Sequence, residues 1–135
     1  MHKRERFRFR AWDRKNERML YNIQYAFDGK EEAGLVEGDG SAAEYFESSF
    51  GEFLESSIYT VMAYTTLDDR EGTPIYEGDT IRYESETGEE GVGEVVFEHG
   101  RFTVESDGKS VLLIDVVLAE VTGNIFEGMG ARAPV

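Results

Sequence analysis

The sequence predicts a mainly β protein: an N-terminal β-hairpin with one short helix, followed by an SH3-like barrel or a curled antiparallel sheet. Three observations lead to this fold class. Apolar and polar residues alternate along much of the first 27 residues, which is the period of a strand. From residue 58 onward, short β-branched and aromatic runs are separated by turns that contain Gly and Asp. Only one segment has apolar residues at helical spacing.

The N-terminal hairpin is predicted from two alternating runs and the polar turn between them. In Arg6–Ala11 the aromatic or small residues occupy odd positions and the arginines even ones. In Met19–Phe27 apolar residues again occupy the odd positions, and Asp13–Asn16 supplies turn residues between the runs. Because side chains on a strand alternate between its faces, we expect the phenylalanines to face the core. The arginines would then face solvent, as on an edge strand.

One helix is predicted within residues 41–57, after a Gly-rich acidic loop over residues 28–40. Ser41 and Glu44 have the spacing of a capping box, in which each side chain hydrogen-bonds the other residue's backbone N–H. Apolar residues then recur at helical spacing, and the glutamates take the opposite face. The expected core face of this helix consists of Phe46, Phe50, Phe53 and Leu54.

Strands and turns account for the rest of the chain. Residues 58–66 are β-branched and aromatic, a loop is expected over residues 85–91, and residues 111–121 are the longest apolar-rich stretch. His99-Gly100 is a two-residue hairpin turn with Gly at a position suited to positive φ. The predicted parts are residues 1–57 (hairpin, acidic loop and helix), residues 58–127 (the barrel-like part) and a fraying tail, residues 128–135.

Charge is unevenly distributed along the chain. Residues 1–18 hold eight of the 14 Lys and Arg and three of the 28 acids, a net charge of +5, which leaves −19 for the remaining residues. A body this acidic repels a phosphate backbone, so a general nucleic-acid binder is disfavoured. A basic segment of one copy could instead dock on the acidic body of another copy.

No catalytic, cofactor or metal site is predicted. The chain has no Cys, and its two histidines, His2 and His99, are too few for a His-rich metal site or a Ser-His-Asp triad. The acids near the turns after residue 67 lack the ligand spacing of a calcium-binding loop, and we expect them to be solvated. These acids are Asp68, Asp69, Glu71, Glu77 and Asp79.

Membrane insertion and secretion are not predicted. The longest apolar run is Val111–Ile114, far too short to span a bilayer. The basic N-terminus is not followed by the apolar region of a signal peptide. We therefore expect a cytoplasmic protein.

Several segments resemble one known family. IYEGDTIRYE (Ile75–Glu84), preceded by YTTLDDREGTP, is similar to the central signature of the YopX family. VTGNIFEG (Val121–Gly128) is similar to the family's closing motif, and RAWD (Arg10–Asp13) resembles its start. Thr66 stands where the family usually has Gly. The resemblance implies a mainly β, phage- or prophage-encoded protein without an assigned enzymatic activity.

The residues of these motifs also have a structural interpretation. Gly78 suits an unusual φ and Asp79 can accept hydrogen bonds from backbone amides, so the segment predicts a tight corner that leads into a strand. A binding corner is the alternative. The motif residues are Tyr76, Glu77, Gly78, Asp79, Gly123 and Asn124.

Candidate interaction residues come from two aromatic patterns. The N-terminal arginines interleaved with aromatics are a solvated strand face, a subunit contact, or a nucleic-acid contact that stacks bases. The phenylalanines of the helix form its core face or, alternatively, a docking surface. These residues are Arg6, Arg8, Arg10, Trp12, Phe46, Phe50 and Phe53.

The sequence as a whole favours a non-enzymatic phage or prophage accessory protein that acts through protein contacts in the cytoplasm of a bacterial host. Its expected partners are further copies of itself or a host or phage protein, with no cofactor. One alternative is a nucleic-acid-associated factor that uses the N-terminal Arg/aromatic strand. Another is an acidic mimic of DNA that inhibits a host protein.

Overall fold

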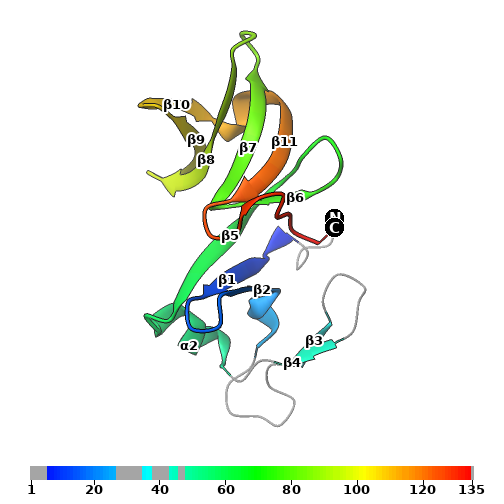
Figure 1. The fold of residues 1–135 in the computed structure, drawn as a ribbon, viewed down its shortest axis with the longest axis vertical. Helices are drawn as coiled ribbons and strands as arrows, with labels where there is room; N and C mark the ends of the chain where they lie inside the picture. The colour runs from blue at the N-terminus through cyan, green and yellow to red at the C-terminus, as the bar shows by residue number, and fades with distance from the viewer. Residues whose placement is uncertain (1–5, 27–34, 38–42, 46–47, 135) are drawn as a thin grey trace. The chain divides into compact units, whose positions relative to one another are not determined.

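The computed structural model describes residues 6–26, 35–37, 43–45 and 48–134. It is mainly β, as predicted, and divides into two compact units, Met1–Tyr64 and Thr65–Val135. The division falls inside one long strand, β5 (Tyr59–Asp68), so this strand contributes to both units (Figure 1). The boundary expected at residues 57/58 assigned the whole of that strand to the C-terminal part.

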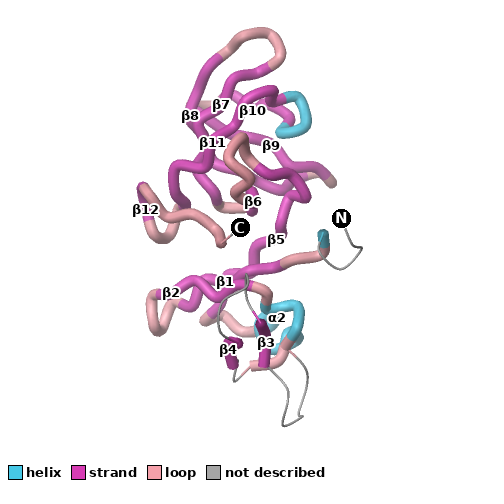
Figure 2. Tube along the Cα trace, turned by 90° about the vertical axis from the view of Figure 1, so that its right-hand side faces the viewer, coloured by secondary structure: helices cyan, strands magenta, loops and turns pink. Residues whose placement is uncertain are grey.

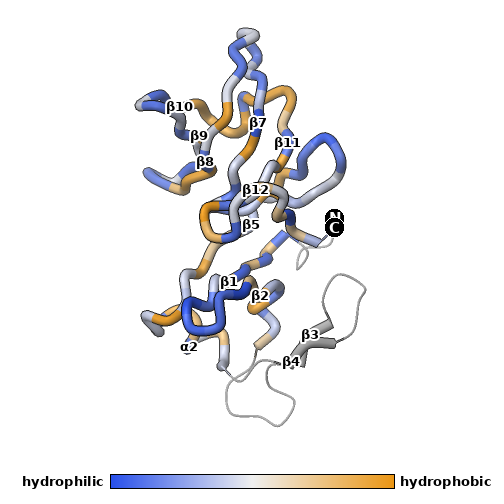
Figure 3. The backbone as a smooth tube through the Cα atoms, viewed as in Figure 1, coloured by the Kyte–Doolittle hydropathy of each residue, from blue (hydrophilic) through white to orange (hydrophobic). Residues whose placement is uncertain are grey.

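The N-terminal unit is built on the predicted hairpin. Strands β1 (Phe9–Asp13) and β2 (Arg18–Tyr21) pair antiparallel across a four-residue turn, which Figure 3 colours as strongly hydrophilic. The second strand is shorter than expected, because Asn22 has a left-handed conformation (φ 60°) and a 3₁₀ helix, η1 (Ile23–Tyr25), follows it. On its other side β1 pairs with the first half of β5, so β1 is a central strand and the edge-strand expectation was wrong.

The helix α2 (Phe50–Glu55) is present but begins later than predicted. Its capping box uses Ser49 and Glu52: the Glu52 N–H donates to Ser49 Oγ (3.2 Å), and the Ser49 N–H donates to Glu52 Oε1 (3.4 Å). Part of the predicted helix is instead a short strand, β4 (Ala43–Tyr45), which pairs with β3 (Leu35–Glu37) inside the expected loop. No helix in the described part of the chain is long and apolar enough to cross a membrane.

The core of the N-terminal unit forms where α2 and η1 meet the sheet. Phe53 is buried and its ring centroid lies 4.5 Å from that of Tyr59, while the Phe9 and Phe50 centroids are 5.3 Å apart. Leu54 is 57% exposed, which corrects its assignment to the core face, because a six-residue helix directs few positions inward. The buried cluster consists of Ala11, Leu20, Ile23, Ala26 and Phe53.

The C-terminal unit is a six-stranded antiparallel sheet in the order β10-β9-β8-β7-β11-β12 that curls into a half-barrel (Figures 1 and 2). Of the two predicted architectures, the curled sheet is the one observed. The short strand β6 (Pro74–Tyr76) joins the edge of the other sheet, next to β5. The six strands are β7 (Asp79–Ser85), β8 (Glu90–Glu98), β9 (Arg101–Ser106), β10 (Lys109–Leu112), β11 (Val116–Asn124) and β12 (Gly128–Met129), with the 3₁₀ helix η2 (Leu113–Asp115) before β11.

Two tight hairpins, at His99-Gly100 and at Asp107-Gly108, and a close glycine contact shape this sheet. His99 and Gly100 have φ of 53° and 77°, so the predicted two-residue turn is confirmed. Strand β8 begins at Glu90, inside the expected loop, and Gly91 leaves room for the ring of its cross-strand partner Tyr83, whose hydroxyl would be 2.8 Å from a Cβ at position 91. The buried cluster consists of Ile75, Ile81, Tyr83, Val95, Val104, Leu113 and Val121.

Thr66 in β5 is a strained position, and its replacement by Gly should stabilise the protein. Thr66 has φ 72°, a left-handed conformation that a β-branched residue adopts only at a cost of about 1–2 kcal/mol. Because Gly also makes the unfolded chain more flexible, we expect Thr66→Gly to raise the free energy of unfolding by about 0.5–1 kcal/mol in urea denaturation. Thr66→Ala, which keeps a Cβ, should gain less. Equal or lower stability of the Gly variant would contradict strain at this position.

Candidate functional site

The N-terminal arginines do not form the solvated face that the alternation predicted. Arg10 is fully buried, and its guanidinium carbon lies 6.0 Å from the centroid of the Tyr21 ring. Arg8 is half-buried, with its guanidinium carbon 4.8 Å from the centroid of Tyr64. Only Arg6 of the three is exposed, and Phe7, expected in the core, is 57% exposed. The prediction failed because β1 lies between two strands, and both Arg10 and the next residue, Ala11, whose side chain takes the opposite face, are buried.

Two further arginines of this segment, Arg14 and Arg18, also bond within the N-terminal unit. Arg14 donates to the Ser57 carbonyl (2.6 Å) and to Thr60 Oγ1 (2.7 Å). Arg18 forms an ion pair with Asp13 (3.4 Å). Much of the +5 charge of residues 1–18 therefore supports the fold, which leaves less of it for a partner than the sequence suggested.

Hydrogen bonds to the side chain of Asp13 stabilise the turn between β1 and β2. Its buried carboxylate accepts the backbone N–H groups of Lys15 (3.0 Å) and Asn16 (3.2 Å), the Asn16 side-chain amide (2.8 Å) and Arg18 Nε (3.4 Å). Burial alone would raise the pKa of this carboxyl, but the hydrogen bonds favour its charged form more strongly and hold the pKa below its ordinary value of 3.8.

The aromatic candidates are used mainly for packing. Trp12 and Phe50 are half-buried and Phe53 is buried, in agreement with the core-face interpretation of Phe50 and Phe53. Phe46 and the predicted cap Ser41 lie outside the described residues. Phe53 is therefore not accessible to a partner, whereas Phe50 is accessible in part.

The two family-like motifs meet in one hydrogen-bonded corner. Gly78 has φ 85°, and Asp79 Oδ2 accepts the Tyr76 N–H (2.8 Å), which is the geometry that the sequence predicted. The Gly78 N–H donates to the Val95 carbonyl (2.9 Å), and the Gly78 carbonyl accepts the Ile125 N–H (2.9 Å). Residues 76–79 are therefore tied both to β8 and to the end of β11.

The second motif closes this corner from the other side. Asn124 Oδ1 accepts the N–H groups of Phe126 (2.9 Å) and Glu127 (2.8 Å), which turns the chain from β11 into β12. A Cβ at Gly123 would overlap the Gly128 carbonyl, so only Gly fits there. Five of the six motif residues thus serve the local fold, namely Tyr76, Gly78, Asp79, Gly123 and Asn124; the sixth, Glu77, is half-buried.

The expectation that the acids after residue 67 are solvated was wrong for two of them. Asp69 and Asp79 are buried, and Asp69 accepts three backbone N–H groups, those of Glu71 (2.9 Å), Thr73 (2.9 Å) and Val121 (2.9 Å). Glu71 is exposed and pairs with Arg132 (3.2 Å). The structure places no group of three metal-ligating side chains together within its described residues. These aspartates therefore organise turns.

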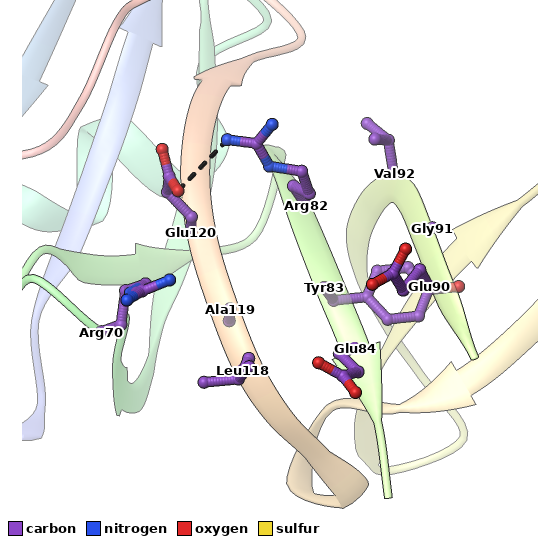
Figure 4. Close-up of a pocket in the computed structure, with 10 residues that line it drawn as sticks. All are labelled: Arg70, Arg82, Tyr83, Glu84, Glu90, Gly91, Val92, Leu118, Ala119 and Glu120. Atoms are coloured by element: carbon purple, nitrogen blue, oxygen red, sulfur yellow. Dashed lines mark hydrogen bonds and ion pairs between the residues drawn. The ribbon is translucent and has the colours of Figure 1, made fainter. Parts of the chain in front are cut away.

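The C-terminal unit has a hollow of about 400 Å³ on the sheet face opposite its core, which we call the β7 hollow (Figure 4). Arg82 on β7 and Glu120 on β11 form an ion pair across it (3.2 Å), and Arg132 also reaches Glu120 (3.5 Å). Arg82, Tyr83 and Glu84 lie in the family-like segment Ile75–Glu84, but nothing in the sequence predicted a site there, because the lining residues come together only through the register of three strands. It is lined by Arg70, Arg82, Tyr83, Glu84, Glu90, Gly91, Val92, Leu118, Ala119 and Glu120.

Comparison with known proteins supports both the family resemblance and the fold. The family model described as YopX protein matches residues 8–129. The crystal structure of protein EF1440 from Enterococcus faecalis is similar, with a TM-score of 0.55 and 26% identity, over 90% of this chain and 94% of that one. No curated protein matches the chain.

The burial of Arg10 has a direct consequence for stability. Arg10→Ala leaves a cavity beside Tyr21 and should lower the free energy of unfolding by about 3 kcal/mol. The exposed Arg6→Ala is the matched control and should change it by less than about 0.5 kcal/mol. Urea denaturation followed by the fluorescence of Trp12, the one tryptophan, reports on this unit. Equal effects of the two substitutions would show that the side chain of Arg10 is accessible to solvent.

The lowered pKa of Asp13 predicts a pH-dependent contribution to stability. A carboxyl with a lowered pKa in the folded state stabilises the fold fully above its ordinary pKa, and this contribution is lost as the pH falls through the folded value. Asp13→Asn should therefore be less stable than wild type by a constant amount above about pH 5, and the gap should narrow below about pH 4.

Urea denaturation at several pH values measures this gap. Glu17→Gln removes an exposed acid of the same turn and is the control. A gap between wild type and Asp13→Asn that stays unchanged down to pH 3 would mean that the folded protein does not favour the charged carboxylate.

Proposed function

The chain belongs to the YopX family, and we propose that it is a non-enzymatic phage or prophage accessory protein that self-associates through protein–protein contacts in the bacterial cytoplasm. One observation carries the proposal. Its buried carboxylates are already bonded to the backbone, whereas large apolar side chains stay exposed on the C-terminal unit.

The positions of the acids and of His99 argue against chemistry at these sites. A general base needs a free lone pair within reach of a substrate proton. The carboxylates of Asp13 and Asp69 each accept several backbone or side-chain donors inside a turn, and Asp79 accepts the Tyr76 N–H. His99 lies exposed at the tip of a hairpin with φ 53°, where its conformation serves the turn.

The exposed apolar side chains of the C-terminal unit support a role in protein contacts. Scattered apolar residues are ordinary on a protein surface, but neighbouring ones on the same strands can form a contact patch. Val92 and Leu118 line the β7 hollow, and Val117 precedes Leu118 on β11. The exposed set is Leu67, Val92, Phe97, Ile114, Val117, Leu118, Ile125 and Met129.

Self-association predicts a solution mass that exceeds the 15.3 kDa of one chain and rises with concentration. Sedimentation velocity from about 1 to 100 μM in physiological salt measures this mass directly, a range that brackets micromolar affinity. A single 15.3 kDa species at every concentration would refute self-association.

The same preparation separates this proposal from the nucleic-acid alternative. Fluorescence anisotropy of labelled single- and double-stranded DNA at low salt should show no binding, because the −19 body repels phosphate and Arg10, Arg14 and Arg18 bond inside the protein or are buried. Micromolar binding that is lost in Arg6→Ala/Arg8→Ala would favour the nucleic-acid factor.

A further inference from the structure

We propose that the β7 hollow is a two-fold interface between two copies of this chain, in which Arg70 of each copy enters the hollow of the other. The inference rests on the proposed self-association and names the surface responsible. The charged and apolar residues around the hollow are arranged so that this surface on one copy complements the same surface on a second copy.

The acidic end of the hollow is formed by two glutamates. Glu84 on β7 and Glu90 on β8 are direct cross-strand partners, and neither forms an ion pair with the described residues. Like charges at directly opposed positions of a sheet destabilise it. A cation from outside this chain would remove that repulsion, so this end of the hollow favours a basic side chain.

The basic end is Arg70, which lies on the other side of β11 from the two glutamates (Figure 4). Its backbone is fixed, because the Arg70 N–H donates to the Ala119 carbonyl on the edge of β11 (3.0 Å) and the preceding Asp69 carboxylate accepts the Val121 N–H. Its exposed side chain forms no ion pair with the described residues. A fixed backbone with a projecting guanidinium is suited to reach an acidic partner.

The middle of the hollow is neutral and partly apolar. Arg82 and Glu120 neutralise each other, and Leu118 and Val92, 45% and 52% exposed, lie on the flanking strands. An arginine that enters could lay its aliphatic stem on Leu118 while its guanidinium reaches the glutamates.

These three features fit a two-fold axis. A closed dimer uses the same patch on both subunits, so each end of the patch must complement the other end. Here a rotation of 180° brings Arg70 of one copy to Glu84 and Glu90 of the other, and forms the same contact a second time. A partner of a different kind would not need both charges on one patch.

Charge-swap variants test this arrangement because they predict both a loss of self-association and its recovery. Arg70→Glu adds a fourth acid to the three that line the hollow of each copy (Glu84, Glu90 and Glu120), and Glu84→Lys/Glu90→Lys places cations there. Each variant by itself should weaken self-association at least tenfold in sedimentation velocity. An equimolar mixture of the two should recover it, because each contact then joins opposite charges. The triple variant Arg70→Glu/Glu84→Lys/Glu90→Lys should recover it as a single protein.

The controls separate the charge swap from changes in folding and in net charge. Arg101→Glu makes the same charge change at an exposed position on β9, outside the hollow, and should leave self-association unchanged. Near-ultraviolet circular dichroism should show that every variant is folded, and recovery in the mixture is possible only with folded chains.

The remaining outcomes overturn either one proposal or both. A monomeric wild type refutes self-association and this interface together. An oligomeric wild type that Arg70→Glu and Glu84→Lys/Glu90→Lys leave intact refutes this interface but keeps the proposed function. Weakened single variants without recovery in the mixture or in the triple variant refute the two-fold pairing of Arg70 with the glutamates.

Discussion

The C-terminal unit depends on the buried carboxylate of Asp69. This side chain and its own backbone close the turn of residues 69–73, and its second oxygen accepts the Val121 N–H on the edge of β11. The Arg70 N–H also donates to the Ala119 carbonyl on β11. Asp69 and Arg70 therefore satisfy backbone groups of β11 that a neighbouring strand would otherwise satisfy. An edge that would otherwise offer free backbone groups is thereby covered, and Arg70 is held at the rim of the β7 hollow.

Buried charge is used in the same way elsewhere in this acidic protein. Asp13 stabilises the β1–β2 turn by accepting the backbone N–H groups of Lys15 and Asn16, and Asp79 stabilises the corner before β7 by accepting that of Tyr76. Burying a carboxylate costs free energy unless such hydrogen bonds satisfy it. The hydrogen bonds of these acids therefore serve to stabilise the fold. The family-like motifs Ile75–Glu84 and Val121–Gly128 are explained by this need, since their polar and Gly residues build one corner between β7, β8 and β11.

Local features of the fold could be predicted from the sequence, but features that depend on distant neighbours could not. Alternation and turn residues located the N-terminal hairpin and the His99-Gly100 turn. The helix start was misplaced because Ser41/Glu44 and Ser49/Glu52 have the same spacing, so the local pattern does not distinguish them. The helix that follows Ser49 packs Phe53 against Tyr59, a contact that the spacing does not reveal. Alternation also shows which arginines share a face, but whether Arg10 is buried depends on β5 pairing with β1, about fifty residues apart in sequence. The β7 hollow needs the register of three strands and has no local signal.

The order of the strands also determines how the sheet can assemble. Strands β7 to β10 follow one another along the chain and pair with their sequence neighbours through short turns, two of them of only two residues. Such local contacts close small loops and form within microseconds. Strand β11 instead pairs with β7, with Asn124 opposite Asp79, so the whole meander lies between the two partners in sequence. Because this pairing is long-range, it forms after the meander. During synthesis the meander is therefore made before β11, the strand that covers the free edge of β7, and this edge stays open until β11 has been released.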